Sequence, residues 1–366
     1  MKNKELFTRL AFLALSILLV LGIIYLIFSF RPESESSAIS VGAVFIGSSD
    51  DDGWNESHYK GIIKACEDQS CHVTAKFNVP EEAGPLGKAV SELVSKGCSC
   101  IFLTSYGYGL CIDPIAAKYP NVAFYDICGE SDEKNCMSYF ARMYQVRYLA
   151  GIVAGSVTQS DVLGYVTAMP VPETIRSVNA YAMGVHRVNP SAKVIVNYTN
   201  SWDDREMEER AVKNLSAAGA DLITFHEDRA YALDLADEMG LYSTGYNFVY
   251  KDYSDKMLTA ALINWDYIYG KVLSDYLSGR ANFSHNYWLG IDDNAVSLYP
   301  CSDLVTADTR SLVEAESERI SGWKDVFSGE IYDNKGNMRC GENERISDEE
   351  LFYYMDWYVE GVEVYE

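Results

Sequence analysis

The residues best suited to chemistry lie in the acidic loop that follows the apolar run 41–47. Asp51 and Asp52 supply carboxylates, Asn55 supplies a carboxamide and Trp54 supplies an aromatic face. A buried strand that turns into such a loop and then into a helix forms a crevice at its carboxyl end, where open α/β sheets bind ligands. These groups suit a neutral, planar ligand rich in hydrogen-bonding groups better than phosphate, which would require lysine and glycine. The alternative is that the segment only caps the helix, with the tryptophan packed as a hydrophobic staple.

Aromatic side chains beside a second polar or aromatic group recur at the ends of the predicted strands. The five pairs are Trp54 with Asn55, Tyr106 with Tyr108, Trp202 with Asp203, Tyr246 with Asn247, and Asn264 with Trp265. Facing aromatic rings hold a flat ligand by stacking, worth about 0.5–1.5 kcal/mol per pair beyond the buried area. Amide and carboxylate groups can then bind the edge of that ligand. One such pair is typical of core packing, but the whole set, spread over both halves of the chain, predicts a ligand-binding cleft.

Familiar catalytic signatures are missing from the sequence. It contains neither the G-x-S-x-G motif of serine hydrolases nor the H-E-x-x-H motif of zinc proteases. Residues 84–88 match a phosphate-binding loop only in part. The segment 107–109 lacks the third glycine of a dinucleotide fingerprint. Paired carboxylates at 203–204 and 292–293 are interpreted as a helix N-cap and a surface turn. The five histidines are scattered, so no zinc site is expected. We therefore predict a protein that is not an enzyme and needs no cofactor.

Short apolar runs alternate with longer amphipathic segments after residue 40. The predicted strands are 41–47, 72–77, 100–104, 122–126, 163–168, 193–198, 222–225 and 242–246, and the predicted helices include 58–66, 84–95, 112–119, 145–155, 231–239 and 303–327. Such alternation gives parallel sheets with right-handed crossovers. The pattern beginning at 93 recurs at 215, with Gly97 and Gly219 at matching helix ends. The predicted fold is therefore α/β, with two doubly wound parallel-sheet lobes around a central cleft.

The predicted domains follow from this alternation and from composition. They are a cytoplasmic N-terminus 1–9, an apolar segment 10–30, a linker 31–40, lobe 1 over 41–160 and 258–295, lobe 2 over 161–257 and 296–345, and an acidic, tyrosine-rich tail 346–366. The segment 257–265 is expected to cross back to lobe 1. In the tail, Tyr353, Tyr354, Trp357 and Tyr358 either cap one lobe or contact a partner.

The segment 10–30 contains no charged residue, and as a helix it would span ~30 Å, about one bilayer core. Lys2, Lys4 and Arg9 precede it, which predicts that the N-terminus stays cytoplasmic and the rest is exported. The run is longer than the apolar part of an ordinary signal peptide. We therefore expect a signal anchor that attaches the protein to the outer face of the cell membrane; the alternative is cleavage near 36–38, which would release it.

The formal net charge of −23 argues against nucleic acid as a partner, since phosphate binding needs a basic surface. The nine cysteines fit an exported protein with disulfides. Cys98 and Cys100 are two residues apart on a predicted strand and are expected on one face. Proximity predicts the pairs Cys66–Cys71, Cys128–Cys136 and Cys301–Cys340, with Cys111 joined to Cys98 or Cys100.

A series of short motifs runs through the chain in a fixed order. They are Asp51-Asp-Gly-Trp-Asn55, Arg142, Gln145-Val-Arg-Tyr-Leu-Ala-Gly151, Gly164-Tyr-Val, Pro170-Val-Pro-Glu173, Asn179-Ala-Tyr, Asn189-Pro190, Ser201-Trp-Asp-Asp204, Gly219-Ala-Asp221, Gly245-Tyr-Asn247 and Asn264-Trp265. Taken together, they resemble the BMP (basic membrane protein) family of extracytoplasmic substrate-binding proteins, which includes PnrA-like purine nucleoside receptors of ABC transporters. The resemblance covers most of the chain from about residue 41 to residue 322.

The resemblance implies a type I periplasmic-binding fold that closes on a purine nucleoside or nucleobase and delivers it to an ABC permease. In this comparison Trp54 and Trp202 form the stacking pair. The other residues implied in ligand binding are Asp51, Asp52, Asn55, Tyr106, Asn179, Asn247 and Trp265. Asp52 stands where nucleoside-binding members commonly have lysine, and Asn264-Trp265 replaces a segment that usually contains serine and lysine.

Three classes of function are compatible with these patterns. The first is a membrane-tethered solute-binding protein that serves a permease through lobe closure. The second is a ligand-sensing or regulatory ectodomain that binds the same class of ligand. The third is an exported enzyme such as a nucleoside hydrolase, against which the absence of a catalytic constellation counts; a purely structural surface protein is the remaining alternative.

Overall fold

The computed structural model describes residues 39–127, 129, 131–283, 285–321 and 324–365. Ser40–Glu366 form one compact unit. The predicted N-terminus, apolar segment and most of the linker lie outside the described residues, as does Cys128. Within the described part of the chain, no helix combines the length and the apolar character needed to cross a bilayer.

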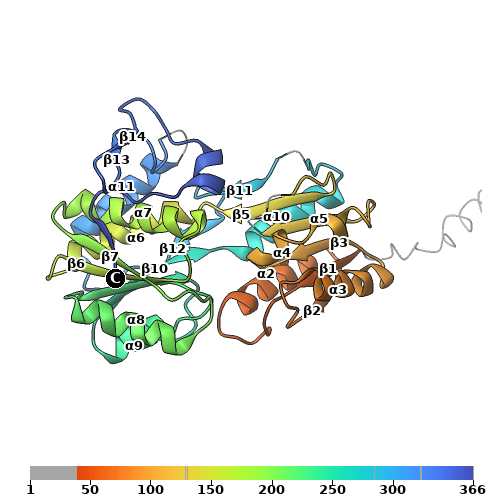
Figure 1. Cartoon of the computed structure of the whole chain (residues 1–366), viewed down its shortest axis with the longest axis horizontal. Coiled ribbons are helices and arrows are strands. Elements are labelled where there is room, and N and C mark those ends of the chain that lie inside the picture. Colours follow the sequence, from red (N-terminus) through yellow and green to blue (C-terminus); the bar gives the residue numbers. More distant parts are fainter. Residues whose placement is uncertain (1–38, 128, 130, 284, 322–323, 366) are drawn as a thin grey trace, which may run out of the picture. The chain divides into compact units, whose positions relative to one another are not determined.

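Lobe 1 is built around a parallel sheet (Figure 1). Its elements are β1 (Ser40–Val44), α2 (Trp54–Asp68), β2 (His72–Lys76), α3 (Ala83–Ser95), β3 (Cys98–Leu103), α4 (Tyr106–Gly109), α5 (Asp113–Ala116), β4 (Ala123–Ile127), β5 (Cys136–Ala141), α10 (Trp265–Leu277) and β11 (Tyr287–Leu289). The strand order is β2-β1-β3-β4-β5-β11, and each pair is parallel. Helices on both faces bury the sheet, which explains why β3 and β4 are nearly continuous apolar runs.

Lobe 2 repeats this plan. Its elements are α6 (Met143–Val157), β6 (Val162–Thr167), α7 (Pro172–Val188), β7 (Lys193–Tyr198), α8 (Arg205–Ala217), β8 (Leu222–His226), α9 (Tyr231–Glu238), β9 (Tyr242–Asn247), β10 (Met257–Ile263), β12 (Val296–Leu298), α11 (Ala307–Ile320) and β15 (Val362–Val364). The strand order is β15-β7-β6-β8-β9-β10-β12, with β12 antiparallel to β10 and the other pairs parallel. Gly151 on α6 and Gly184 on α7 let these helices touch, because a Cβ on either would overlap the other helix's backbone.

The two doubly wound sheets confirm the predicted fold class. In each lobe the chain starts at an inner strand, β1 or β6, adds one neighbour on one side and then continues on the other side. This reversal places a crevice at the carboxyl ends of the central strands. Gly97 and Gly219 have positive φ values of 85° and 100°, in keeping with the helix ends predicted for them.

The lobe boundaries differ from the predicted ones in two elements. We expected α6 in lobe 1, but it packs on α7 and β10 of lobe 2. The strand β10, also assigned to lobe 1, pairs with β9 in the second sheet, and the chain crosses back only at Trp265. Helix packing decides the first case and strand pairing the second, and neither kind of partner is encoded in local periodicity.

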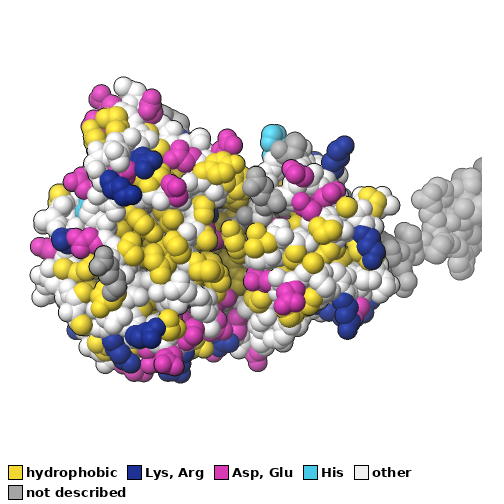
Figure 2. All heavy atoms as spheres, in the orientation of Figure 1, with side chains coloured by type: hydrophobic (Ala, Val, Ile, Leu, Met, Phe, Trp, Pro, Cys, Tyr) yellow, Lys and Arg dark blue, Asp and Glu magenta, His cyan; other side chains and the backbone are white. Residues whose placement is uncertain are grey.

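The C-terminal segment, which runs from β13 (Ile331–Tyr332) to residue 365, caps lobe 2. Capping one lobe was one of the two alternatives predicted for the tail. The segment also contains β14 (Met338–Cys340) and a π-helical turn (Glu350–Tyr354) that packs on α7, and it ends by adding β15 to the free edge of β7. Figure 2 shows hydrophobic side chains gathered where the two lobes meet on this face of the molecule.

The eight described cysteines are free thiols, so the predicted disulfides that lie wholly within the described residues are not formed. Cys98 and Cys100 also do not share a face. The register of β3 against β1 shifts between them, so Cys98 packs in the cluster on the α3 side and Cys100 packs in the main core with Cys66. Cys111 follows the carboxyl end of β3 and Cys98 begins the strand, which separates these two thiols by its length.

Candidate functional site

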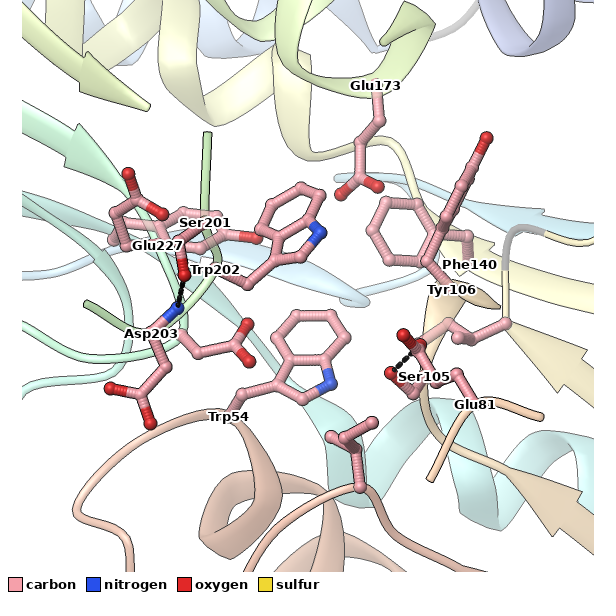
Figure 3. Close-up of a pocket in the computed structure, with 14 residues that line it drawn as sticks. Trp54, Glu81, Ser105, Tyr106, Phe140, Glu173, Ser201, Trp202, Asp203 and Glu227 are labelled. Atoms are coloured by element: carbon pink, nitrogen blue, oxygen red, sulfur yellow. Dashed lines mark hydrogen bonds between the residues drawn. The ribbon is translucent and has the colours of Figure 1, made fainter. Parts of the chain in front are cut away.

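A cavity of about 230 Å³ lies between the lobes, and Figure 3 shows the residues that line it. Lobe 1 contributes Ile46, Trp54, Glu81, Ser105, Tyr106, Ile127 and Phe140, and lobe 2 contributes Glu173, Ser201, Trp202, Asp203, Glu227, Asp228 and Tyr246. Most of these residues end a strand or follow one within a few positions. The cavity therefore occupies the crevice that the strand order creates, and a ligand in it touches both lobes.

Trp54 and Trp202 supply one indole face from each lobe. In Figure 3 the two rings lie one above the other at the cavity. The Trp54 Nε1 donates to the backbone oxygen of Thr104 at 2.8 Å, which fixes this ring against the end of β3. The Trp202 ring meets the imidazole of His226 edge-on, with centroids 6.2 Å apart. Two indoles in this arrangement can hold a flat ring by stacking.

The polar wall of the cavity is acidic. Five carboxyl groups line it, those of Glu81, Glu173, Asp203, Glu227 and Asp228, and no lysine or arginine is among the lining residues. Carboxylates accept hydrogen bonds, so the wall suits a ligand that donates them. It disfavours phosphates and other anions.

Two of the five carboxylates lie at exposed positions and have neighbours that compensate them. Glu81 accepts hydrogen bonds from Ser105 Oγ at 2.5 Å and from the backbone nitrogen of Gly107 at 2.6 Å, near the start of α4. Asp203 forms an ion pair with Arg229, with 3.1 Å between Oδ2 and Nε. These two groups shape the rim of the site.

The other lining carboxyls are more buried. Glu173 lies 3.4 Å from His226 Nε2, but burial lowers the pKa of His226 to about 4, so the imidazole is neutral at pH 7. Glu227 is 1% exposed and accepts a hydrogen bond from the Thr199 hydroxyl at 2.8 Å. Its Oε2 has no hydrogen-bond partner among the described residues. Burial raises the pKa of Glu227 well above its usual range, and the neighbouring Glu208 adds to the rise.

Asp228 is the lining residue that joins the lobes. Its backbone oxygen accepts a hydrogen bond from the Trp54 nitrogen across the cleft at 2.9 Å, and its own nitrogen donates to the Trp202 oxygen at 2.9 Å. The half-buried side chain makes no hydrogen bond or ion pair within the described part of the chain. Burial raises its pKa well above the usual range, and the carboxylates of Asp203 and Asp51 raise it further.

Three of the nine residues predicted for the ligand site line the cavity: Trp54, Tyr106 and Trp202. The polar side chains of the acidic loop before α2 form hydrogen bonds within the loop and with the start of the helix. The Asp51 carboxylate accepts hydrogen bonds from the backbone nitrogens of Gly53, Asn55 and Glu56, which begin the helix. Asn55 in turn accepts from Gly47, so neither side chain is directed to the cavity.

Asp52 and Asn179 also lie outside the cavity lining. Asp52 is exposed and has a positive φ of 50°, which marks it as a turn residue. Asn179 is fully buried on α7, and its amide binds the C-terminal segment. Nδ2 donates to the Trp357 oxygen at 2.8 Å, and Oδ1 accepts from the Val359 nitrogen at 3.0 Å. The segment beyond residue 345 thus binds the Asn179 amide, which we predicted would bind the ligand.

Asn247 and Trp265 bridge the lobes beside the cavity. The Trp265 Nε1 donates to Asn247 Oδ1 at 2.9 Å, and Asn247 Nδ2 donates to Ser57 Oγ of α2 at 3.1 Å. Trp265 also packs on the imidazole of His58 with 3.8 Å between centroids. These two residues act in the contact between lobes and do not line the cavity.

The sequence interpretation missed most of the acidic wall. Glu227 and Asp228 lie two and three residues after the predicted strand 222–225, and Glu173 belongs to a motif that was noted without a role. Ligands bind at the carboxyl ends of the strands in open α/β sheets, and applying this rule to every strand could have identified Glu227 and Asp228. The aromatic–polar pairs and the family resemblance both indicated Asn247 instead.

Comparisons with known proteins agree with this geometry. Residues 38–328 match the family described as ABC transporter substrate-binding protein PnrA-like (Bmp). A purine-binding protein from Brucella abortus is 31% identical over 335 residues, which covers 89% of this chain and 93% of the relative. A putative ABC transporter glucose-binding protein, TsgA13, from Haloferax volcanii is 28% identical and covers 90% of this chain and 82% of its own length.

Solved structures share the fold. A transcriptional activator of the comK gene from Bacillus halodurans superposes with a TM-score of 0.69 at 22% identity, covering 77% of this chain and 97% of that one. A solute-binding protein of an ABC transporter system from Aeropyrum pernix gives 0.67 at 18% identity, with 77% and 91% covered. The two-lobed architecture is thus the type I solute-binding fold that the motifs implied. The chain belongs to the Bmp family of PnrA-like ABC transporter substrate-binding proteins.

Proposed function

We propose that this protein captures a purine nucleoside or nucleobase between its lobes and delivers it to an ABC permease. The observation that carries the proposal is the pair of indoles, Trp54 and Trp202, that face one cavity from opposite lobes. A purine offers a flat ring for them and a hydrogen-bonding edge for the polar wall. The 31% identical relative named as purine-binding supports the same ligand class. We also propose that segment 10–30 attaches the protein to the extracytoplasmic face of the membrane.

Lobe closure is the proposed mechanism of capture. Gly53 lies close against the opposite lobe, because a Cβ there would overlap the backbone oxygen of Asp228. The Trp54–Asp228 backbone hydrogen bond and the Asn247–Ser57 bond both cross between lobes. A ligand that contacts both lobes favours the closed form by its differential affinity, and the permease can then distinguish loaded from empty protein.

A hexose is the second candidate ligand. The relative from Haloferax volcanii is named as a putative glucose-binding protein, and a carboxylate-rich wall can accept hydrogen bonds from sugar hydroxyls. The cavity volume suits either class of small molecule. The two candidates differ in the hydrogen-bonding pattern that they present, so direct binding measurements separate them.

A thermal-shift screen of the purified full chain tests the proposal. The panel contains purine and pyrimidine nucleosides, free bases and hexoses. A ligand at 100 times its Kd stabilises the folded state by about 2.7 kcal/mol, which moves the Tm by a few degrees. A shift confined to purines supports the proposal, a shift with hexoses alone replaces it with the second candidate, and no shift with either class refutes both.

A further inference from the structure

The charge of the cavity carries an inference about the ligand. Five carboxyl groups line the cavity. One of them, Asp203 at the rim, forms an ion pair with Arg229. Deeper in the site, Glu173 faces a neutral imidazole and Glu227 keeps one buried carboxyl oxygen without a hydrogen-bond partner among the described residues. The Asp228 side chain has no partner in the same part of the chain.

We propose that the ligand presents a positive charge to Asp228, as an N-alkylated heteroaromatic cation or a protonated amine would. This inference rests on the proposed function of the cleft and names the chemical class of its ligand. It departs from the neutral ligand that the acidic loop alone suggested. In Figure 3 Glu173 points toward the space beside the Trp202 indole, so a second carboxylate is directed at the same cavity.

The physical reason is the energetic cost of closing an acidic cleft. Lobe closure removes water from the lining groups, and a desolvated carboxylate is unfavourable unless an opposite charge pairs with it. Within the described residues no side chain supplies that charge to Asp228. A cationic ligand supplies it, and the flanking indoles add a favourable cation–π interaction.

The surroundings of Asp228 make this residue sensitive to the charge of the ligand. Carboxylates from both lobes, Asp51 and Glu81 on one side and Asp203 and Glu173 on the other, raise its pKa in addition to burial. A neutral ligand leaves this mutual repulsion in place. A cation between the lobes offsets the charge of these carboxylates and so favours the closed form.

Matched neutral and cationic probes test the inference by calorimetry at pH 7. The pairs are adenosine with 1-methyladenosine, nicotinamide with 1-methylnicotinamide, and glucose with glucosamine. N6-methyladenosine controls for the added methyl group, because it is neutral. We expect the cation of at least one pair to bind about tenfold more tightly than its neutral partner, as a charge-assisted hydrogen bond would provide.

The variant Asp228→Asn keeps the backbone hydrogen bonds and removes the charge. It should lose about tenfold in affinity for the cation and stay within about twofold for the neutral partner. Asp252→Asn, an exposed carboxylate of the same lobe, is the matched control and should change neither affinity. Glu173→Gln is the second variant if Asp228→Asn fails to fold, with the same selective loss expected.

The outcomes separate the inference from the proposed function. If purines bind and no cation of the three pairs binds more tightly than its neutral partner, the inference is overturned while the purine proposal stands. If only glucosamine or 1-methylnicotinamide binds, the purine proposal fails and the inference stands. Equal losses for both members of a pair in Asp228→Asn would assign Asp228 an ordinary hydrogen bond and refute the charge argument, and so would the absence of binding by every cation.

Discussion

Gly53→Ala should weaken ligand binding without unfolding either lobe. The added Cβ would overlap the backbone oxygen of Asp228 and lie 3.3 Å from its carbonyl carbon, both on the opposite lobe. Closure then loses the Trp54–Asp228 hydrogen bond, about 0.5–1.5 kcal/mol, and gains overpacking strain of about 1–3 kcal/mol. A closed form destabilised by roughly 1.5–4.5 kcal/mol corresponds to an affinity lower by about 10- to 10³-fold.

Calorimetry with adenosine, or with whichever probe shifts the Tm, measures this loss, and small-angle X-ray scattering shows whether ligand still compacts the protein. Gly84→Ala is the matched control, since a Cβ at that position of α3 meets no atom within 4 Å. The control should retain affinity and closure. Full affinity and normal compaction in Gly53→Ala would refute the reasoning, because they would mean that the ligand-bound form does not use this close approach.

Three further predictions concern the cavity wall, the buried carboxyl group of Glu208 and the C-terminal segment. Trp202→Ala should cost roughly 1–3 kcal/mol of binding free energy, the usual range for stacking on an aromatic side chain; unchanged affinity in the folded variant would remove Trp202 from the stacking pair. Burial raises the pKa of Glu208 to about 9 from its ordinary 4.5, so between these values the folded state holds a proton that the unfolded state has lost, and stability falls by roughly 1.4 kcal/mol per pH unit as pH rises. Urea unfolding from pH 5 to pH 9 should show this slope flattened in Glu208→Gln, and an equal slope would contradict it. Asn179→Ala should lower stability by about 1–3 kcal/mol and expose the C-terminal segment to protease, because two buried hydrogen bonds are lost; reduced affinity with unchanged stability would instead restore Asn179 as a ligand contact.

Much of the fold could be predicted because each lobe repeats one simple pattern. The predicted strands correspond to β1 through β4 and β6 through β9, and Gly97 and Gly219 mark helix ends in both lobes. The strand β5 was missed, although Ser138 is the one polar residue that interrupts the apolar run Cys136–Ala141. The assignment of β10 to the wrong lobe has another cause, because it depends on which sheet edge the strand pairs with.

The side-chain contacts of the site were harder to predict than its location. Sequence placed the cleft correctly at the strand ends, and the two predicted indoles reach it from opposite lobes. It could not show that the C-terminal segment takes the Asn179 amide, because those residues are far apart in the sequence. The sequence also could not show that the Asp51 carboxylate accepts hydrogen bonds from the backbone of its own loop.

Several residues that were predicted to bind the ligand contribute instead to the contact between the two lobes. Asp51 and Asn55 hold the loop in the shape that carries Gly53 and Trp54 to the opposite lobe. Asn247 and Trp265 add hydrogen bonds beside the same contact. These groups make the closed form possible for any ligand that fits between the indoles. Under the proposed mechanism, discrimination among ligands falls to the lining carboxyls, whose charge is matched by hydrogen-bond donors or by a cation as the lobes close.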